Sequence, residues 1–435
     1  MKYYSLNRKA KDVDFSEAVV RGLAPDNGLY FPENIKSLPQ SFFENITELS
    51  NHEIAYQAIR QFVSEAIPDH ELKTIVEDTL CFDFPVIRLN NNISTLELFH
   101  GPTMAFKDVG ARFMARCLGY FNKNNTNEVT VLVATSGDTG GAVASGFLGV
   151  KGVNVVILYP SGKVSEIQEK QLTTLGQNIT ALEVDGTFDD CQAMVKKAFV
   201  DQELINHMQL TSANSINVAR WLPQLFYFLF AYKTLKQKQK HQSVVFSIPS
   251  GNFGNICAGM IAQKLGMPVK HFIASNNENN VVTRYLKTGV YDVKPSVQTI
   301  SNAMDVGSPS NFIRIQELHN NDFETLKSNL SSYYFTDDVT REALDEIYTK
   351  YGYIADPHGA VGYLGCKAYL ETQPNAHCVF LETAHPTKFL DVVEEVIQTE
   401  LILPEQIKAV MDKTKTAIAI EDYQSFKNYL LSKKF

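Results

Sequence analysis

The chain has 435 residues, 44% of them hydrophobic and 20% charged, which is enough for two or three globular domains with separate cores. Its net charge of −8 and the lack of a long basic run beyond residues 233–241 argue against nucleic-acid binding. The N-terminus has no apolar core, the longest apolar run spans only residues 222–232, and six cysteines lack metal-ligand or CxxC spacing, so we expect a cytoplasmic protein with reduced thiols and no membrane segment.

The first 90 residues are expected to form an N-terminal segment, to which we assign no chemistry. Residues 21–35 combine Gly, Pro, Asp and Asn and therefore predict a loop or turn. Helical patterns follow over residues 51–66 and 70–79.

A lysine stands near the predicted start of the next helix. The Gly101-Pro102 turn follows an apolar run, and helix-face spacing of apolar residues begins soon after it. Lys107 lies at that start, where the helix dipole disfavours a cation. Among apolar neighbours its pKa would fall, and a neutral amine is a nucleophile for carbonyl groups. The competing interpretation is a surface lysine beside its neighbour Asp108.

Strands and helices alternate from residue 128 onward. The first unit has expected strands at 128–134, 153–160 and 179–184 and helices at 142–148, 165–175, 187–200 and 218–235. The second has strands at 243–249, 269–275 and 377–383 and helices at 256–265, 279–289, 336–351, from about 359, and at 388–399. The alternation predicts parallel sheets with right-handed crossovers. We expect a less regular segment over 290–332 that contains an ordered loop at 300–312, and three parts: 1–90, 91–238 and 239–435.

The turn at Ser250–Asn255 follows a buried strand and opens a helix. Backbone N–H groups and the helix dipole converge at such a point and suit a phosphate. The sequence is neither a Walker loop nor a GxGxxG fingerprint. A plain strand-to-helix turn is the competing interpretation.

A second glycine-rich turn, Thr135–Gly141, follows the strand at 128–134, at the edge where open α/β sheets bind ligands. Ser136 and Thr139 suit an anion, whereas Asp138 would repel one and fits a hydrogen-bond donor or a helix cap. Two such turns and one unusual lysine together suggest a phosphorylated carbonyl cofactor, and pyridoxal 5′-phosphate meets that description.

Five motifs, in this order, resemble the threonine synthase family: HGPTMAFKD, TSGDTG, SANSINVARW, SGNFGN and ETAHPTKF. The stretches RGLAPDNGLYFPE, MDVGSPSNF and DPHGAVGY also match it, so the likeness covers nearly the whole chain. The resemblance implies an α/β protein of the tryptophan-synthase-β fold type. Such a protein has two doubly wound parallel-sheet domains, pyridoxal phosphate in the cleft between them, and an N-terminal, mostly helical segment.

The resemblance also implies which residues hold the cofactor. Lys107 is the Schiff-base lysine and the proton shuttle. The cofactor phosphate is cradled by Gly251, Asn252, Phe253, Gly254 and Asn255. Asp138 faces the 3′ oxygen, where many relatives of the fold place asparagine. Thr383 contacts the pyridine nitrogen, with a helix N-cap as the competing interpretation.

The implied substrate is O-phospho-L-homoserine. The planar guanidinium of Arg220 suits its phosphate, and Asn214, Ser136 and Thr139 complete the expected substrate site. The competing interpretation of Arg220 is an ion pair on a helix surface. We assign no role to the histidines of the motifs and expect no metal.

The implied reaction is that of threonine synthase, the last step of threonine biosynthesis. Phosphate leaves by γ-elimination, water adds at Cβ, and L-threonine is released. The alternative is a related pyridoxal-phosphate phospho-lyase or dehydratase that acts on O-phosphothreonine or on serine and threonine. A non-catalytic binding protein of the same fold is disfavoured by the presence of Lys107, the glycine turn and Thr383. The assembly is expected to be a monomer or a homodimer.

Overall fold

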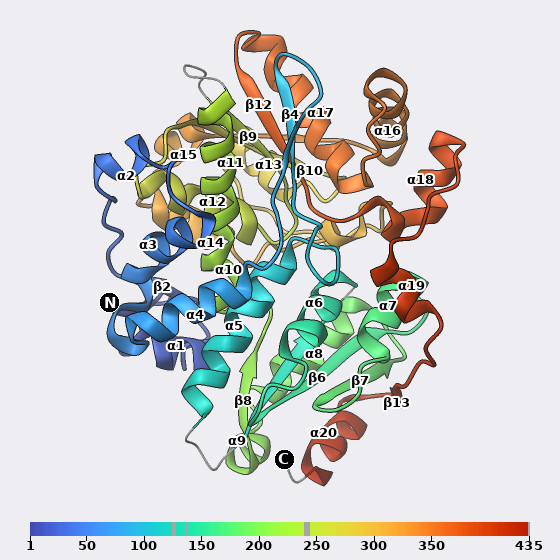
Figure 1. The fold of residues 1–435 in the computed structure, drawn as a ribbon. Coiled ribbons are helices and arrows are strands. Elements are labelled where there is room, and N and C mark those ends of the chain that lie inside the picture. The colour runs from blue at the N-terminus through green and yellow to red at the C-terminus, as the bar shows by residue number, and fades with distance from the viewer. Residues whose placement is uncertain (124–127, 136, 239–243, 434–435) are drawn as a thin grey trace.

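Two sheets flanked by helices form the frame of the molecule and occupy the lower and upper halves of the view in Figure 1. The computed structural model describes residues 1–123, 128–135, 137–238 and 244–433. Within these ranges, no helix is long and apolar enough to cross a bilayer.

The lower sheet is fully parallel, with strand order β13-β7-β6-β5-β8. Its strands are β5 (Val129–Ala134), β6 (Val153–Pro160), β7 (Ile179–Val184), β8 (Gln209–Ser212) and β13 (Ile418–Ile420). Its helices are α6 (Asp138–Phe147), α7 (Glu166–Thr173), α8 (Phe188–Ala198) and α9 (Gln202–His207). Every residue of β5 is buried, as its continuous apolar run requires.

The upper sheet has six strands in the order β11-β10-β9-β12-β4-β3, parallel except for the β3–β4 pair. They are β3 (Val86–Arg88), β4 (Ile93–Glu97), β9 (Val244–Pro249), β10 (Val269–Asn276), β11 (Leu330–Tyr334) and β12 (His377–Glu382). The helices of this half are α12 (Gly254–Lys264), α13 (Val281–Thr288), α14 (Phe312–Leu318), α15 (Phe323–Asn329), α16 (Asp337–Tyr351), α17 (Pro357–Thr372) and α18 (Leu390–Ile397).

The N-terminal segment is mostly helical. It contains the antiparallel pair β1 (Tyr3–Ser5) and β2 (Tyr30–Pro32) and the helices α1 (Phe15–Arg21), α2 (Gln40–Glu44), α3 (Asn51–Val63) and α4 (Asp69–Thr79). A capping box at Ser50 and Glu53 fixes the start of α3.

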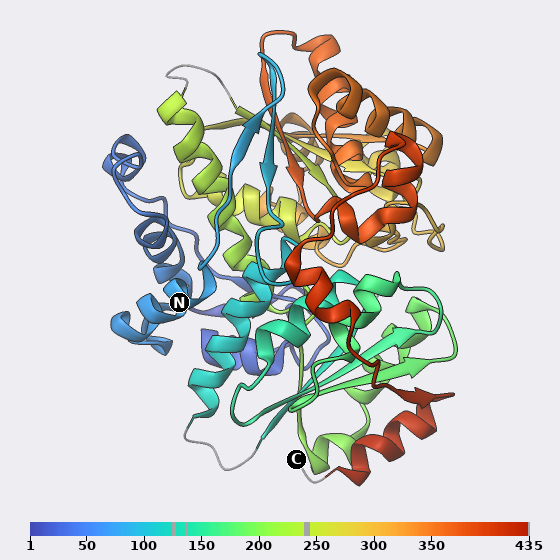
Figure 2. The ribbon, with the colours of Figure 1, turned by 45° about the vertical axis from the view of Figure 1, so that its right-hand side comes forward.

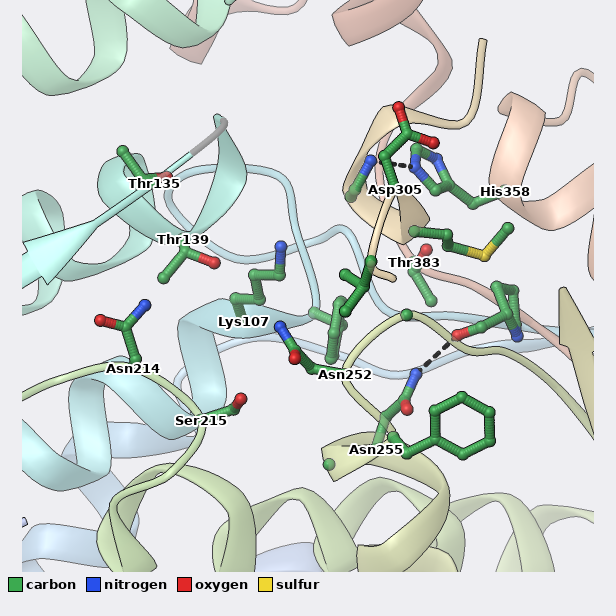
Figure 3. Close-up of a pocket in the computed structure, with 18 of the residues that line it drawn as sticks. Lys107, Thr135, Thr139, Asn214, Ser215, Asn252, Asn255, Asp305, His358 and Thr383 are labelled. Carbon is green, nitrogen blue, oxygen red and sulfur yellow. Dashed lines mark hydrogen bonds between the residues drawn. The ribbon is translucent and has the colours of Figure 1, made fainter. Parts of the chain in front are cut away.

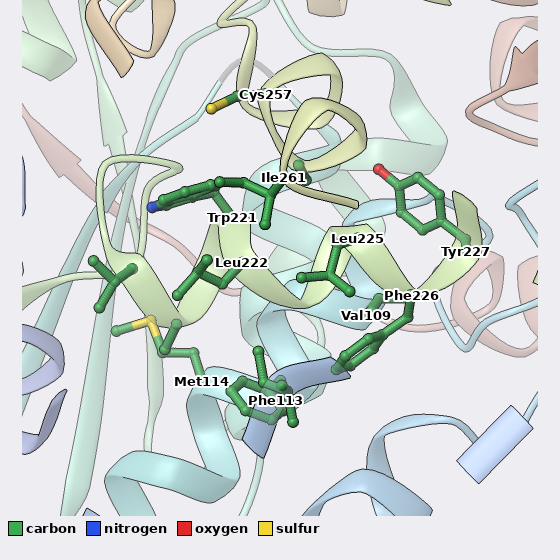
Figure 4. Packing of buried hydrophobic residues seen from close by; sticks show 14 of the residues in the cluster. Val109, Phe113, Met114, Trp221, Leu222, Leu225, Phe226, Tyr227, Cys257 and Ile261 are labelled. Carbon is green, nitrogen blue, oxygen red and sulfur yellow. The ribbon is translucent and has the colours of Figure 1, made fainter. Parts of the chain in front are cut away.

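A shared hydrophobic core joins the two halves. It lies around α5 (Lys107–Asn122), α10 (Val218–Trp221), the 3₁₀ turn η2 (Leu222–Gln224) and α11 (Leu225–Lys238). Trp221 and Leu222 lie near Met114 of α5 and Ile261 of α12 in Figure 4, so side chains from both halves share one cluster. The single helix expected over 218–235 is wrong in one respect, because Pro223 has no N–H to continue the ladder and the chain turns through η2.

The segment 290–332, which the sequence predicts to be less regular, contains several short elements. It contains the 3₁₀ turn η3 (Asn302–Met304), α14, α15 and the start of β11. Both α-helices have only seven residues, which is too short for a 3.6-residue period to stand out. By contrast, β6 and β7 have the bounds that their apolar runs predict.

Each sheet takes a strand from beyond the expected domain boundaries. β4, at residues 93–97, pairs with β12 in the upper sheet, whereas β13, near the C-terminus, pairs with β7 in the lower one. Figure 2 shows the C-terminal chain running from the upper half back to the lower half, through α19 (Glu405–Met411) to α20 (Tyr423–Ser432). The chain therefore crosses between the halves several times.

Candidate active site

A cavity lies between the two halves, where strands from both sheets end. The segments that follow β5, β9 and β12 line it, as expected for ligand sites in open α/β sheets. Its lining includes Lys107, Thr135, Thr139, Asn214, Ser215, Arg220, Gly251, Asn252, Phe253, Gly254, Asn255, Asp305, His358 and Thr383. In Figure 3 the Lys107 side chain projects into the cavity, with Thr139 on one side and Asn252 and Thr383 on the other.

The loop before Lys107 is fixed by a buried carboxylate. Asp108 accepts hydrogen bonds from the Thr103 backbone N–H (2.9 Å) and hydroxyl (2.6 Å). A Cβ on Gly101 would lie 2.4 Å from Asp108 Oδ2, so this close approach requires glycine. Asp108 therefore bonds the Thr103 turn and does not pair with Lys107. Because Lys107 lines the cavity, its interpretation as a surface lysine beside Asp108 is wrong.

The amine of Lys107 is prepared for nucleophilic chemistry. Burial lowers its pKa to about 8, Asp138 opposes that shift, and the cations Lys388 and Arg220 add to it. Within the described ranges, Lys107 makes no ion pair. Its Nζ lies 5.7 Å from the centroid of the Phe106 ring.

The turn after β9 presents backbone groups to the cavity. Phe253 adopts a left-handed conformation (φ 62°) and α12 begins immediately after it. A Cβ on Gly251 would lie 2.9 Å from both Ala303 O and Met304 Cα, so η3 packs directly on this glycine. Backbone N–H groups in the first turn of a helix lack carbonyl partners within it, so this turn suits an anion.

Most of the polar side chains of this turn are already hydrogen-bonded inside it. Ser250 donates to Ile248 O (2.8 Å), and the Asn255 amide donates to Pro249 O (2.8 Å). Asn252 Oδ1 accepts hydrogen bonds from the N–H and hydroxyl of Ser310, which turns its amide nitrogen into a separate donor. The turn would therefore hold an anion mainly through the backbone and Asn252.

The turn after β5 is organised by Thr135, whose Oγ1 accepts from the N–H groups of Gly137 (3.0 Å) and Gly140 (2.8 Å). α6 starts at Asp138, four residues before the expected helix, because Gly140 and Gly141 are themselves helical and Gly137 is the N-cap. Thr139 lines the cavity. Ser136 lies outside the described residues.

Asp138 is paired with a lysine that the sequence did not single out. Lys388 Nζ lies 2.5 Å from Asp138 Oδ1, and Gln168 Nε2 donates to the same oxygen at 3.0 Å. Burial opposes ionisation of Asp138, but Lys388 and Lys107 hold its pKa well below the usual range. Lys388 belongs to the ETAHPTKF motif, and its place in that motif was the only signal available.

Arg220 is buried, and its guanidinium makes few hydrogen bonds within the described residues. Its Nη1 donates to Lys107 O at 3.4 Å, and its Nε has no hydrogen-bond partner among the described residues. Burial lowers its pKa to about 10, so it remains a cation at neutral pH. A surface ion pair is therefore the wrong interpretation of this arginine.

The neighbouring substrate candidates come from the same loop. Asn214 donates to Ala134 O at 2.9 Å, which fixes its amide at the cavity wall. Ser215, which we did not predict, also lines the cavity, and its hydroxyl accepts from Asn311. Its place in the motif SANSINVARW was the only signal.

Thr383 follows β12 directly and lines the cavity. The N-cap interpretation is wrong, because His385 caps the following 3₁₀ turn η4 (Pro386–Phe389). Nearby, His358 Nε2 accepts from Ala303 N–H, and its Nδ1 lies 2.5 Å from Asp356. Nε2 thus contacts the η3 loop, and Nδ1 contacts the residue that caps α17.

Comparisons with known proteins agree along the whole chain. The family model "Pyridoxal-phosphate dependent enzyme" matches residues 84–383, and the models for the threonine synthase N terminus and C-terminal region match residues 2–80 and 359–430. The chain is 44% identical to threonine synthase of Haemophilus influenzae and 42% identical to that of Escherichia coli, over 94% of each chain in both cases.

Solved structures agree with the sequence matches. The crystal structure of threonine synthase from Escherichia coli superposes with a TM-score of 0.92 at 40% identity, covering 99% of both chains. That of pyridoxal-phosphate-bound threonine synthase from Brucella melitensis gives 0.91 at 33% identity, also over 99% of both chains. The chain therefore belongs to the threonine synthase family and is a pyridoxal-phosphate-dependent enzyme.

Proposed function

We propose that this enzyme converts O-phospho-L-homoserine and water into L-threonine and phosphate, with Lys107 as its catalytic residue. The observation that carries this proposal is one cavity with three parts: a half-buried amine that makes no ion pair with the described residues, a backbone turn suited to one phosphate, and a buried arginine suited to a second. A substrate that itself carries a phosphate needs the arginine in addition to the amine and the backbone turn.

The residues present fit pyridoxal phosphate. Lys107 Nζ projects into the cavity, and the start of α12 supplies free N–H donors on the opposite wall. The backbone of Gly251 lies too close to η3 for a side chain, which leaves the main chain itself as the wall of the cradle. We assign the cofactor phosphate to Gly251, Asn252, Phe253, Gly254 and Asn255, the 3′ oxygen to Asp138, and the pyridine nitrogen to Thr383.

The cofactor would supply an electron sink that acidifies the substrate's carbon-bound protons. Thr383 offers the pyridine nitrogen a neutral hydroxyl, so no carboxylate there favours a protonated ring. Lys107 then does the proton work. With a pKa of about 8, its amine takes the Cα proton near neutral pH and returns a proton at the end of the reaction.

We assign the substrate phosphate to Arg220, Asn214, Thr139 and Ser136. The Arg220 Nε–H has no partner among the described residues, so an anion that reaches the guanidinium would gain charge-assisted hydrogen bonds. Because Arg220 also bonds the backbone carbonyl of Lys107, binding of the phosphate is connected to the position of the catalytic amine. Release of the γ-phosphate and addition of water at Cβ then give L-threonine.

The test is a coupled assay on the purified protein with pyridoxal phosphate and O-phospho-L-homoserine. Phosphate and L-threonine should appear in equal amounts with the wild type, and neither should appear with Lys107→Ala. Lys9→Ala, at an exposed position, serves as the matched control and should keep the wild-type rate.

Two outcomes would contradict the proposal. Phosphate accompanied by a 2-oxo acid in place of threonine would identify the lyase alternative. Turnover of O-phosphothreonine in preference to O-phospho-L-homoserine would identify the other related activity.

A further inference from the structure

Lys388 is a fully buried lysine that the reaction described above does not use. Its Nζ lies 2.5 Å from Asp138 Oδ1 and donates to Thr103 O at 3.0 Å. A lysine is buried only at a substantial cost in desolvation unless a carboxylate accompanies it. A residue that serves packing alone would more readily be apolar.

Asp138 stands within the electrostatic reach of two amines, those of Lys107 and Lys388. It forms its ion pair with Lys388, whereas Lys107 makes none within the described ranges. A carboxylate paired with Lys107 would stabilise the protonated amine, which is not a nucleophile. Lys388 keeps Asp138 from pairing with Lys107, because it forms the ion pair itself. Its positive charge also disfavours a proton on Lys107.

We propose that Lys388 is a positioning residue that acts through Asp138: it occupies the carboxylate, so that the amine of Lys107 stays unpaired, loses its proton more readily and is free for the cofactor's carbonyl group. This inference rests on the proposed function and deepens it. It also explains how a carboxylate can face the 3′ oxygen of the cofactor, since the Asp138–Lys388 pair carries no net charge.

Other charged groups lie around this array. Arg220, on α10, also acts on Lys107 and lowers its pKa. Asp108 and His385 lie within the field of Lys388. On the wall of the cavity formed by the upper half, Asp305 accepts hydrogen bonds from Thr299 and Asn277. These groups stay unchanged in the variants below, so their effects cancel in the comparison.

The competing explanation is that Lys388 merely anchors η4 to the carbonyl of Thr103. The two explanations differ in what removal of Asp138 does to a Lys388 variant. If Lys388 acts through the carboxylate, removing both charges restores Lys107. If Lys388 is only an anchor, removing Asp138 as well restores nothing.

The experiment measures how reductive methylation of Lys107 depends on pH in the full-length chain freed of cofactor. Formaldehyde and cyanoborohydride label only neutral amines, and the Lys107 peptide is quantified by mass spectrometry with exposed Lys9 as internal reference. The chains compared are wild type, Lys388→Met, Lys388→Arg, Asp138→Asn and the double variant Lys388→Met with Asp138→Asn.

The wild-type midpoint for Lys107 should lie near its pKa of about 8. In Lys388→Met it should rise by about one unit, which lowers labelling at pH 7 by about tenfold. Lys388→Arg should keep the wild-type midpoint because it keeps the charge. The double variant, which buries no unpaired charge, should return to it.

An unchanged midpoint in Lys388→Met would overturn the proposal, as would a double variant that resembles Lys388→Met. If Lys388→Met fails to fold, Asp138→Asn alone tests the proposal. Its Lys107 midpoint should lie at or below that of the wild type, and a higher midpoint would contradict the proposal. Failure of the proposed function would appear in the phosphate and threonine assay and would leave all these midpoints in place.

Discussion

Two side chains that the structure leaves incompletely paired, Lys107 and Arg220, define the chemistry at the scale of single residues. Arg220 is a cation at neutral pH and Lys107 is an amine with a lowered pKa, and neither has a carboxylate partner within the described ranges. Such groups cost stability when the cavity contains no ligand, and they interact strongly with an anion once one binds. Perturbed groups of this kind cluster at functional sites.

Arg220→Met tests the substrate side of the site. The substrate phosphate would lose charge-assisted hydrogen bonds from the guanidinium, so we expect KM for O-phospho-L-homoserine to rise by about 10- to 100-fold, with a smaller effect on kcat. Steady-state kinetics with the loaded enzyme provide the measurement. Arg220→Lys keeps the charge but loses the planar guanidinium, so its KM should lie between those of the wild type and Arg220→Met. A KM equal to that of the wild type in Arg220→Met would remove this arginine from the phosphate site.

Sequence patterns predicted these residues unequally. Lys107 stood out because a lysine at a helix start conflicts with the helix dipole, and that conflict is local. Lys388 gave no comparable signal, because its reason for burial is a carboxylate 250 positions earlier in the chain. Ser215 was missed for a similar reason, since its neighbours in space, such as Asn311, are distant in sequence.

At the scale of elements, the long buried strands were predictable and the short elements were not. β6 and β7 carry continuous apolar runs and have the expected bounds. α14 and α15 are too short to show a period, and their positions depend on packing against α12 and β11. Which strands pair also depends on contacts far apart in sequence, as the places of β4 and β13 show.

A buried carboxyl at the end of β12 connects this strand to the start of α17. Glu382 Oε1 accepts from the N–H of Asp356, and Asp356 in turn caps α17 through His358 N–H. Burial raises the pKa of Glu382 well above its ordinary value, and the negative charges of Asp356 and Glu97 add to this. The folded protein therefore holds a proton on Glu382 that the unfolded chain releases above a pH of about 4.3.

The sign of the pH effect follows from that proton. Stability supplied by the protonated carboxyl is complete below the unfolded pKa and declines as pH rises toward the folded pKa. Gln cannot lose a proton, so Glu382→Gln should gain about 1–3 kcal/mol relative to the wild type between pH 5 and pH 8. Urea unfolding at the two pH values gives the measurement, with exposed Glu342→Gln as the control. An equal difference at both pH values would show that Glu382 is ionised in the folded protein.

At the scale of the whole molecule, the lower sheet is completed by the last part of the described chain. β13 pairs with β7, and Phe426 and Leu430 of α20 are fully buried in the same cluster as Leu182 and Val184. The lower half thus combines residues from the middle of the sequence with residues 418–432. Removing a buried aromatic ring from α20 should therefore destabilise the lower sheet, although four of its strands lie more than two hundred residues earlier in the sequence.

Phe426→Ala tests this dependence. The transfer and cavity terms for a buried Phe predict a loss of about 3–5 kcal/mol in the free energy of unfolding. Gln424→Ala, on the exposed side of the same helix, should change it by no more than about 0.5 kcal/mol. Denaturant unfolding followed by far-UV circular dichroism measures both. A small loss in Phe426→Ala would mean that α20 is dispensable for the lower half.

The ion pair between Asp138 and Lys388 also has a consequence for the order of synthesis. Lys107 leaves the ribosome early, whereas Thr383 and Lys388 emerge almost three hundred residues later. A chain that stops before residue 388 has the amine and its neighbouring carboxylate but lacks the second cation. On the proposal above, we expect Lys107 in such a chain to stay protonated and to capture the cofactor poorly.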